Sequence, residues 1–167
     1  MIYIGGNVMI IKGTSCYENA KNGNLVSITG DGGKAWGFYG QVYKKMAPKL
    51  YLWQYYHNNP DELSEDELID WYIKEFYNLR LKNLNPHHFL ETLNQKFGNE
   101  IIILCHELPG TEINKMHFCH RRLWTDWLEL ETGIVIPEIS IDKNGVVKQE
   151  DIYDLKPKIK LLTKNQL

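Results

Sequence analysis

The stretch Ile101-Ile102-Ile103-Leu104-Cys105 is an uninterrupted run of apolar residues. Such a run is typical of a central strand that is buried on both faces of a mostly parallel sheet. Two shorter stretches upstream, residues 8–12 and 25–29, are rich in β-branched residues and bounded by Gly or Asn, so each predicts another buried strand. The sequence therefore predicts a sheet built around residues 101–105.

Helical patterns precede and follow this strand. Ser64 and Glu67 form a capping box before apolar residues at helical spacing, which predicts a helix over residues 65–81. Similar signals predict helices at residues 86–97 and from about residue 119 to Gly133, and a strand at residues 134–139. This alternation predicts a single α/β domain, with a mostly parallel sheet covered by helices in a Rossmann-like three-layer arrangement.

We expect this domain to span residues 1–141. From Asp142 onward the sequence indicates only a turn at Lys143-Asn144-Gly145 and a polar tail that is interrupted by proline and rich in lysine. Residues 142–167 are therefore predicted to form an irregular C-terminal extension.

Composition narrows the class of protein. Of the 167 residues 43% are hydrophobic, which suffices for a core without disulfides. Three cysteines, an odd number, are typical of an intracellular protein with reduced thiols. No stretch approaches the roughly 20 apolar residues of a membrane span, and residues 1–12 lack the features of a signal peptide. A cytoplasmic protein without a membrane partner is expected.

The charge of the chain limits its partners. A net charge of −2 and a pI near 6.3 give no overall attraction to the phosphates of nucleic acids. A nucleic-acid partner would need a local basic patch, for which the lysine-rich C-terminus is the candidate. The oligomeric state stays open.

The segment from Cys105 to Arg122 concentrates reactive side chains. It holds two of the three cysteines, three of the six histidines and two of the three arginines of the chain. In open α/β sheets, ligands bind beyond the carboxyl ends of the strands, where loops lead into helix N-termini. We therefore expect the functional site here, centred on Cys119, His120 and Arg121.

Three residues of this segment are candidate catalytic groups. Cys119 is the candidate nucleophile or redox thiol, because a cysteine at a helix start beside cationic side chains ionises readily. His120 is the candidate base or proton donor, and Glu107 can orient it. The alternative is that Cys119 is a small buried hydrophobe, since it shares the apolar stripe of Leu123 and Trp127.

The neighbouring residues are candidates for ligand binding. Arg121 and Arg122 are expected to bind an anion, because a guanidinium suits phosphate or carboxylate. Cys105 and His106, where the predicted strand ends, complete the candidate ligand-binding set. The alternatives are a core position for Cys105 and a surface charge for Arg122.

A zinc site is an alternative, because the segment supplies enough donors: Cys105, His106, His117, Cys119 and His120. The spacing does not favour it. The segment has no Cys-x-x-Cys or His-x-x-x-His pair, and neighbouring residues of a strand point to opposite faces. No metal and no other cofactor is therefore expected.

A glycine-rich segment, Gly30-Asp31-Gly32-Gly33-Lys34, superficially resembles a phosphate-binding loop. It lacks the Walker spacing and has no Ser or Thr after its lysine. Its glycines are better explained by a turn that requires positive φ angles.

The motifs of the candidate site resemble a known family. They are Leu104-Cys105-His106-Glu107, Pro109-Gly110 and Cys119-His120-Arg121-Arg122-Leu123, followed by Trp127 and Pro137-Glu138. In these the chain resembles the YeaO-like domain-of-unknown-function family of bacterial proteins, over roughly residues 13–139. It departs from the family pattern in its glycine-rich loop and in a longer loop before Cys119. The resemblance implies the fold and the site but no established activity.

The function that these features favour is a small enzyme acting on a phosphate-bearing or nucleotide-like substrate at the helix N-terminus. One alternative is a non-catalytic module that binds the phosphates of a nucleotide or nucleic acid. Another is a protein-association domain in which the Cys-His-Arg motif is structural.

Overall fold

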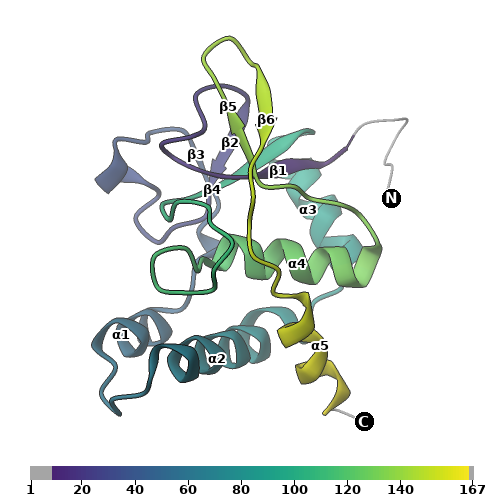
Figure 1. Ribbon diagram of the computed structural model, residues 1–167. Coiled ribbons are helices and arrows are strands. Elements are labelled where there is room, and N and C mark those ends of the chain that lie inside the picture. Colours follow the sequence, from purple (N-terminus) through teal and green to yellow (C-terminus); the bar gives the residue numbers. More distant parts are fainter. Residues whose placement is uncertain (1–8, 166–167) are drawn as a thin grey trace.

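The computed structural model describes residues 9–165. Within them, four strands form one parallel sheet in the order β1-β4-β2-β3 (Figure 1). Their bounds are β1 Ile11–Cys16, β2 Asn24–Ser27, β3 Gln41–Val42 and β4 Ile101–Cys105. The predicted central strand is confirmed. The first strand begins three residues later than predicted, at Ile11, and Val8 lies outside the described residues.

The central strand β4 belongs to two cores at once. All five of its side chains are buried. Ile101 and Ile103 belong to the larger hydrophobic cluster, which includes side chains from the helices, whereas Ile102 and Leu104 belong to a smaller cluster. Because successive side chains of a strand point to opposite faces, an uninterrupted apolar run fills both.

The part of the chain that the structure describes contains five α-helices. They are α1 Leu50–Asn58, α2 Glu65–Phe76, α3 Pro86–Phe97, α4 His120–Thr132 and α5 Lys156–Lys164. Short 3₁₀ turns are η1 Lys34–Trp36 and η2 Lys44–Met46, and the π-helical turn η3 Tyr77–Leu81 continues α2 to the end of the predicted helix. None of these helices has the length and apolar character needed to cross a membrane.

Predicted end signals of the helices are present in the structure. The Ser64 side chain accepts a hydrogen bond from the Glu67 amide, and the Glu67 carboxylate accepts one from the Ser64 amide. Gly133 ends α4 with a φ of 74°, a left-handed conformation that favours glycine. The start of α2 and the end of α4 therefore lie where their capping residues predict.

In Figure 1 the sheet lies above α4, and α1, α2 and α5 lie below it. Trp124 of α4 is buried in the larger hydrophobic cluster. Its ring lies 4.8 Å from that of Phe89 in α3, and its Nε1 donates to the Met46 carbonyl at 2.8 Å. The predicted fold class, a single α/β domain with a parallel sheet covered by helices, is confirmed.

The strand predicted at residues 134–139 is wrong in its position. The structure instead has β5 at Ile139–Ile141, paired antiparallel with β6 at Val147–Gln149. Pro137 lacks the amide hydrogen that a strand needs, so the regular ladder starts after it. The turn predicted at residues 143–145 joins β5 to β6.

The C-terminal segment also differs from the predicted irregular tail. It forms β6 and α5, and Tyr153, Leu155 and Ile159 belong to the larger core. The apolar residues that hold it in place are few and separated by lysines, which makes the segment look polar in sequence.

Candidate active site

A cavity of about 580 Å³ opens at the carboxyl ends of β2 and β4, where the N-terminus of α4 meets the sheet. Its lining comes from the segments that follow these two strands, from α1 and α2, and from the start of α4. Four predicted site residues lie on it: His106, Glu107, Cys119 and His120. This is the edge of the sheet at which a ligand was expected.

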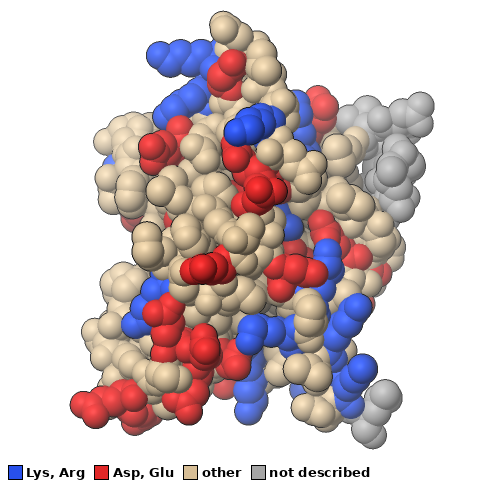
Figure 2. Space-filling model, in the orientation of Figure 1, with Lys and Arg blue, Asp and Glu red and all other residues tan. Residues whose placement is uncertain are grey.

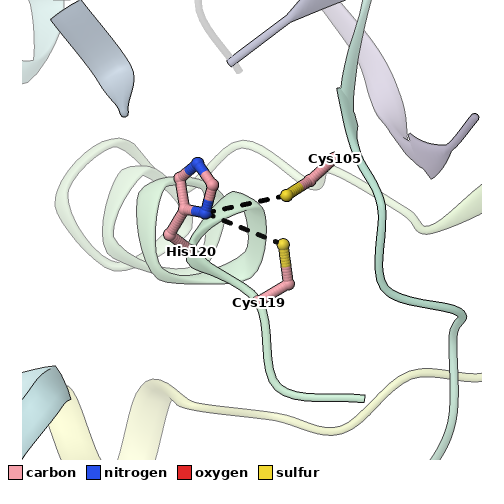
Figure 3. Close-up of side chains that lie close together, drawn as sticks. All are labelled: Cys105, Cys119 and His120. Atoms are coloured by element: carbon pink, nitrogen blue, oxygen red, sulfur yellow. Dashed lines mark hydrogen bonds between the residues drawn. The ribbon is translucent and has the colours of Figure 1, made fainter. Parts of the chain in front are cut away.

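Cys119 is the N-cap of α4, and its sulfur accepts a hydrogen bond from the Arg121 amide at 3.5 Å. Figure 3 shows the sulfur atoms of Cys119 and Cys105 both directed at Nδ1 of His120, at 3.9 and 3.7 Å. The structure therefore brings the thiol of Cys105 next to the adjacent pair Cys119 and His120, which lies 14 and 15 residues further along the chain.

The structure determines the protonation of one ring nitrogen of His120, Nε2. Its Nε2 lies 2.9 Å from the carbonyl oxygen of Ile28, which can only accept a hydrogen bond, so Nε2 carries hydrogen. Nδ1 is left to exchange a proton with the thiols. Such an arrangement of a cysteine and a histidine is the usual means of activating a thiol nucleophile.

The surroundings favour the thiolate of Cys119. Burial raises its pKa, but hydrogen bonds from Cys105 and His120 and the charge of Arg121 lower it by more, to about 6. Burial lowers the pKa of His120, and the adjacent Cys119 raises it above its ordinary value. These two shifts describe a thiolate beside an imidazolium.

Cys105 is the second thiol and behaves differently. Burial, followed by the hydrogen bond with Cys119, raises the pKa of its thiol well above the ordinary value. The thiol donates to Oε2 of Glu107 at 3.1 Å. Cys105 thus lies in the core, as its strand position indicates, and still contacts the site.

Glu107 is ionised in this environment. Burial raises its pKa, whereas the hydrogen bond and charge of His106 lower it by more, and the pKa lies well below its ordinary value. Nε2 of His106 is 3.0 Å from Oε1 of Glu107, and the imidazole ring stacks on Trp36. In the structure Glu107 therefore contacts His106 and Cys105.

The structure places Arg121 in the interior, where it is fully buried. Its Nη2 donates to Oε1 of Glu138 at 2.8 Å, and its Nε donates to the same carboxylate at 3.2 and 3.3 Å. Nη1 lies 4.0 Å from Oε2 of Glu107. The carboxylate of Glu138 thus takes the place that the sequence analysis assigned to an anionic ligand.

Arg122 is buried as well. Its guanidinium donates to Oδ1 of Asp126 at 2.8 Å, to Oγ1 of Thr14 at 2.8 Å and to the carbonyl of Ile136 at 2.9 Å. It joins α4 to β1 and to the segment before β5. Neither arginine is part of the cavity lining.

In the glycine-rich loop, backbone amides bind a carboxylate of the loop itself, that of Asp31. The carboxylate of Asp31 accepts hydrogen bonds from the amides of Gly33 and Ala35 and from the hydroxyl of Thr29, and the first two lower its pKa most. Gly32 and Gly33 have φ angles of 75° and 86°. The preferred explanation, a turn that needs positive φ, is confirmed.

Two groups of side chains have donor atoms close enough to hold a metal ion. Cys105, Cys119 and His120 form one, and Cys105, His106 and Glu107 form the other, with donor atoms within 4.8 Å of one another in each. Sequence spacing did not favour the first group because only the fold brings Cys105, at the end of β4, next to Cys119 and His120 at the start of α4. The expectation that no metal binds stays a prediction.

Aromatic side chains form the walls of the cavity, and the sequence analysis did not assign them to the site. They are Trp36, Trp53, Tyr56, Tyr72 and Phe118. The Tyr56 hydroxyl is buried and has no hydrogen-bond partner among the described residues. One indication of them was present in the sequence, the aromatic residues that follow the glycine-rich loop. Aromatic residues alone do not distinguish a cavity wall from a core.

No family model, curated protein or solved structure matches the chain. The resemblance to the YeaO-like family therefore stays a prediction, together with what it implies. The function is therefore inferred from the residues of the cavity.

Proposed function

We propose that the protein is a small enzyme that acts on a nucleotide-like substrate, with the thiolate of Cys119 as its nucleophile. The observation that carries this proposal is the position of Cys119 at a helix N-terminus, beside Nδ1 of His120, on the lining of an aromatic cavity. The helix dipole and the imidazole both favour a thiolate there.

In the proposed reaction the sulfur of Cys119 attacks an electrophilic carbon of the substrate. A carbon–sulfur bond forms as the bond to the leaving group breaks, and the imidazolium of His120 gives its proton to that group. Neutral His120 then takes a proton from a water molecule, whose oxygen bonds to the same carbon. The carbon–sulfur bond breaks, and the product leaves with the Cys119 thiolate restored.

The cavity favours the base of a nucleotide over its phosphate. Trp36 and Trp53 are 59% and 47% exposed and offer flat faces on which a heterocyclic ring can stack. The described lining contains no lysine or arginine.

The nucleic-acid alternative receives less support from the surface charge. Figure 2 shows the lysines over α5 close to acidic side chains. Lys156 and Lys158 lie 2.6 Å from Glu129 and Asp70, respectively. Both charges are therefore partly neutralised within the chain. The three free cysteines support a cytoplasmic location, which belongs to the same proposal.

The rate at which iodoacetamide alkylates Cys119 is expected to follow a titration with a midpoint near pH 6. Because the pKa is lowered, the thiolate persists at neutral pH, and the reaction is lost as the pH falls through this midpoint. Mass spectrometry of the alkylated peptide measures the rate at intervals of about one pH unit, from about pH 4 to about pH 10. A midpoint at or above about 8.5 contradicts the nucleophile role.

Two variants make this measurement specific. His120→Asn removes the imidazole and should move the midpoint upward, toward the ordinary cysteine value. His117→Asn is the matched control, since the His117 ring contacts the Leu108 carbonyl and does not line the cavity. It should leave the midpoint unchanged.

Nucleoside monophosphates are expected to quench the tryptophan fluorescence of the protein, because a stacked base contacts Trp36 or Trp53. Titration with AMP, GMP, CMP and UMP measures this, with ribose 5-phosphate as the ligand that lacks a base. Trp36→Phe should weaken the quenching, whereas Trp71→Phe, away from the lining, should not. Equal protection of Cys119 from alkylation by ribose 5-phosphate and by the four nucleotides would show that the base is not recognised.

A further inference from the structure

Cys105 and Cys119 place two thiols together beneath the cavity. Cys105 ends β4 and Cys119 precedes α4, and Figure 3 shows their sulfur atoms converging on His120. The two sulfurs lie within 4.8 Å of each other. A disulfide requires about 2.05 Å, so they need to approach by less than about 3 Å.

We propose that the protein also reduces hydroperoxides, with Cys119 as the thiol that attacks the peroxide and Cys105 as the thiol that resolves the product. This activity uses the same Cys119 thiolate as the proposed function but does not need the nucleotide-like substrate. In compartments that keep thiols reduced, disulfides are typically transient and serve catalysis or redox sensing.

The first step oxidises Cys119. Its thiolate sulfur attacks the terminal peroxide oxygen, so that a sulfur–oxygen bond forms and the oxygen–oxygen bond breaks. The departing alkoxide takes the proton of the His120 imidazolium, which lies next to the sulfur. Cys119 becomes a sulfenic acid, and the peroxide is reduced to an alcohol or to water.

The second step uses Cys105. Its sulfur attacks the sulfenic sulfur of Cys119, so that a disulfide forms and the sulfur–oxygen bond breaks. The departing hydroxide combines with the proton of the Cys105 thiol, which already points at Glu107, and leaves as water. A dithiol reductant then exchanges with the disulfide, restores both thiols and is itself oxidised to a disulfide.

The two thiols have the different environments that these roles need. Cys119 lines the cavity, where a peroxide can reach it, whereas Cys105 lies behind it and is fully buried. The third thiol, Cys16, is the competitor, because its Cα is the register partner of Cys105 in the sheet. Cys16 does not line the cavity and belongs to neither group of clustered donors.

The test oxidises the reduced protein with hydrogen peroxide and maps its disulfides by mass spectrometry. The expected product has lost two hydrogens, joins the peptides of Cys105 and Cys119, and keeps Cys16 free. With dithiothreitol present, peroxide consumption should continue over many turnovers. A disulfide between Cys16 and Cys105, or survival of all three thiols, would overturn the proposal.

Variants separate the two steps. Treated with peroxide in the absence of dithiothreitol, Cys105→Ser and Cys105→Ala should retain the sulfenic acid and yield a dimedone adduct on Cys119, whereas Cys119→Ser should consume no peroxide. Cys16→Ser is the control and should behave as the unaltered protein. A dimedone adduct that is no more abundant in the two Cys105 variants than in the unaltered protein would contradict the resolving role. If the alkylation midpoint is low but no Cys105–Cys119 disulfide forms, the peroxide-reducing activity alone is rejected. If the disulfide forms but nucleotides do not bind, the proposed nucleotide-like substrate alone is rejected.

Discussion

Replacing Glu138 with alanine is expected to lower the free energy of unfolding by about 3–5 kcal/mol. The variant leaves the guanidinium of Arg121 fully buried without the carboxylate that accepts its hydrogen bonds. It also removes the acceptor of the Thr14 hydroxyl. An unpaired buried charge costs far more than an exposed one, because water cannot replace the missing partner. Urea unfolding followed by circular dichroism measures the loss.

A second variant tests whether the loss of stability comes from leaving Arg121 without its partner Glu138. The double variant Arg121→Met with Glu138→Leu removes both charges and should be more stable than Glu138→Ala. Lys148→Ala is the control, because the exposed ammonium of Lys148 lies 3.8 Å from Glu150, and such a pair at the surface is worth about 0–1 kcal/mol. A loss below about 1 kcal/mol in Glu138→Ala would show that Arg121 does not depend on this carboxylate.

The sequence predicted those elements whose signals are local. The run at residues 101–105 marks its strand by length and composition, and Ser64 with Glu67 marks a helix start by two hydrogen bonds three residues apart. The approximate location of the site was also predictable, since strand ends and helix starts meet at one edge of a parallel sheet.

The partners of the site residues were not predictable, because they come from distant elements. A guanidinium suits a protein carboxylate as well as a phosphate, and only the fold shows that Glu138 lies beside Arg121. Helix α1 was missed because Leu50, Tyr51 and Trp53 are exposed, which hides the apolar stripe of a surface helix. The cavity wall that α1 supplies was missed with it.

Deleting residues 151–167 is expected to remove most of the stability of the domain. The deletion takes Tyr153, Leu155 and Ile159 out of the larger core, and each such buried side chain contributes roughly 1.5–3 kcal/mol. It also leaves the carboxylate of Asp126 without the amide of Leu155. Domains of this size are stable by only about 5–15 kcal/mol, so the shortened chain should lack a cooperative thermal transition.

A single substitution on α5 separates the effect of lost core packing from the effect of a lost ion pair. Lys158→Ala removes an exposed ion pair with Asp70 and should shift the free energy of unfolding by about 0–1 kcal/mol. If the shortened chain retained the melting temperature of the full chain, residues 151–167 would not contribute to the stability of the core.

The strand order has a consequence for how the molecule is made. β4 lies between β1 and β2, and its residue Ile103 pairs with Thr14 on one side and Val26 on the other. During synthesis both neighbours leave the ribosome long before β4. Until β4 arrives, neither can form its pair with it, although β2 can already pair with β3. Pairing over such sequence separations makes folding slow, so the nascent chain carries unpaired strand edges for most of its synthesis and is exposed to aggregation in that interval.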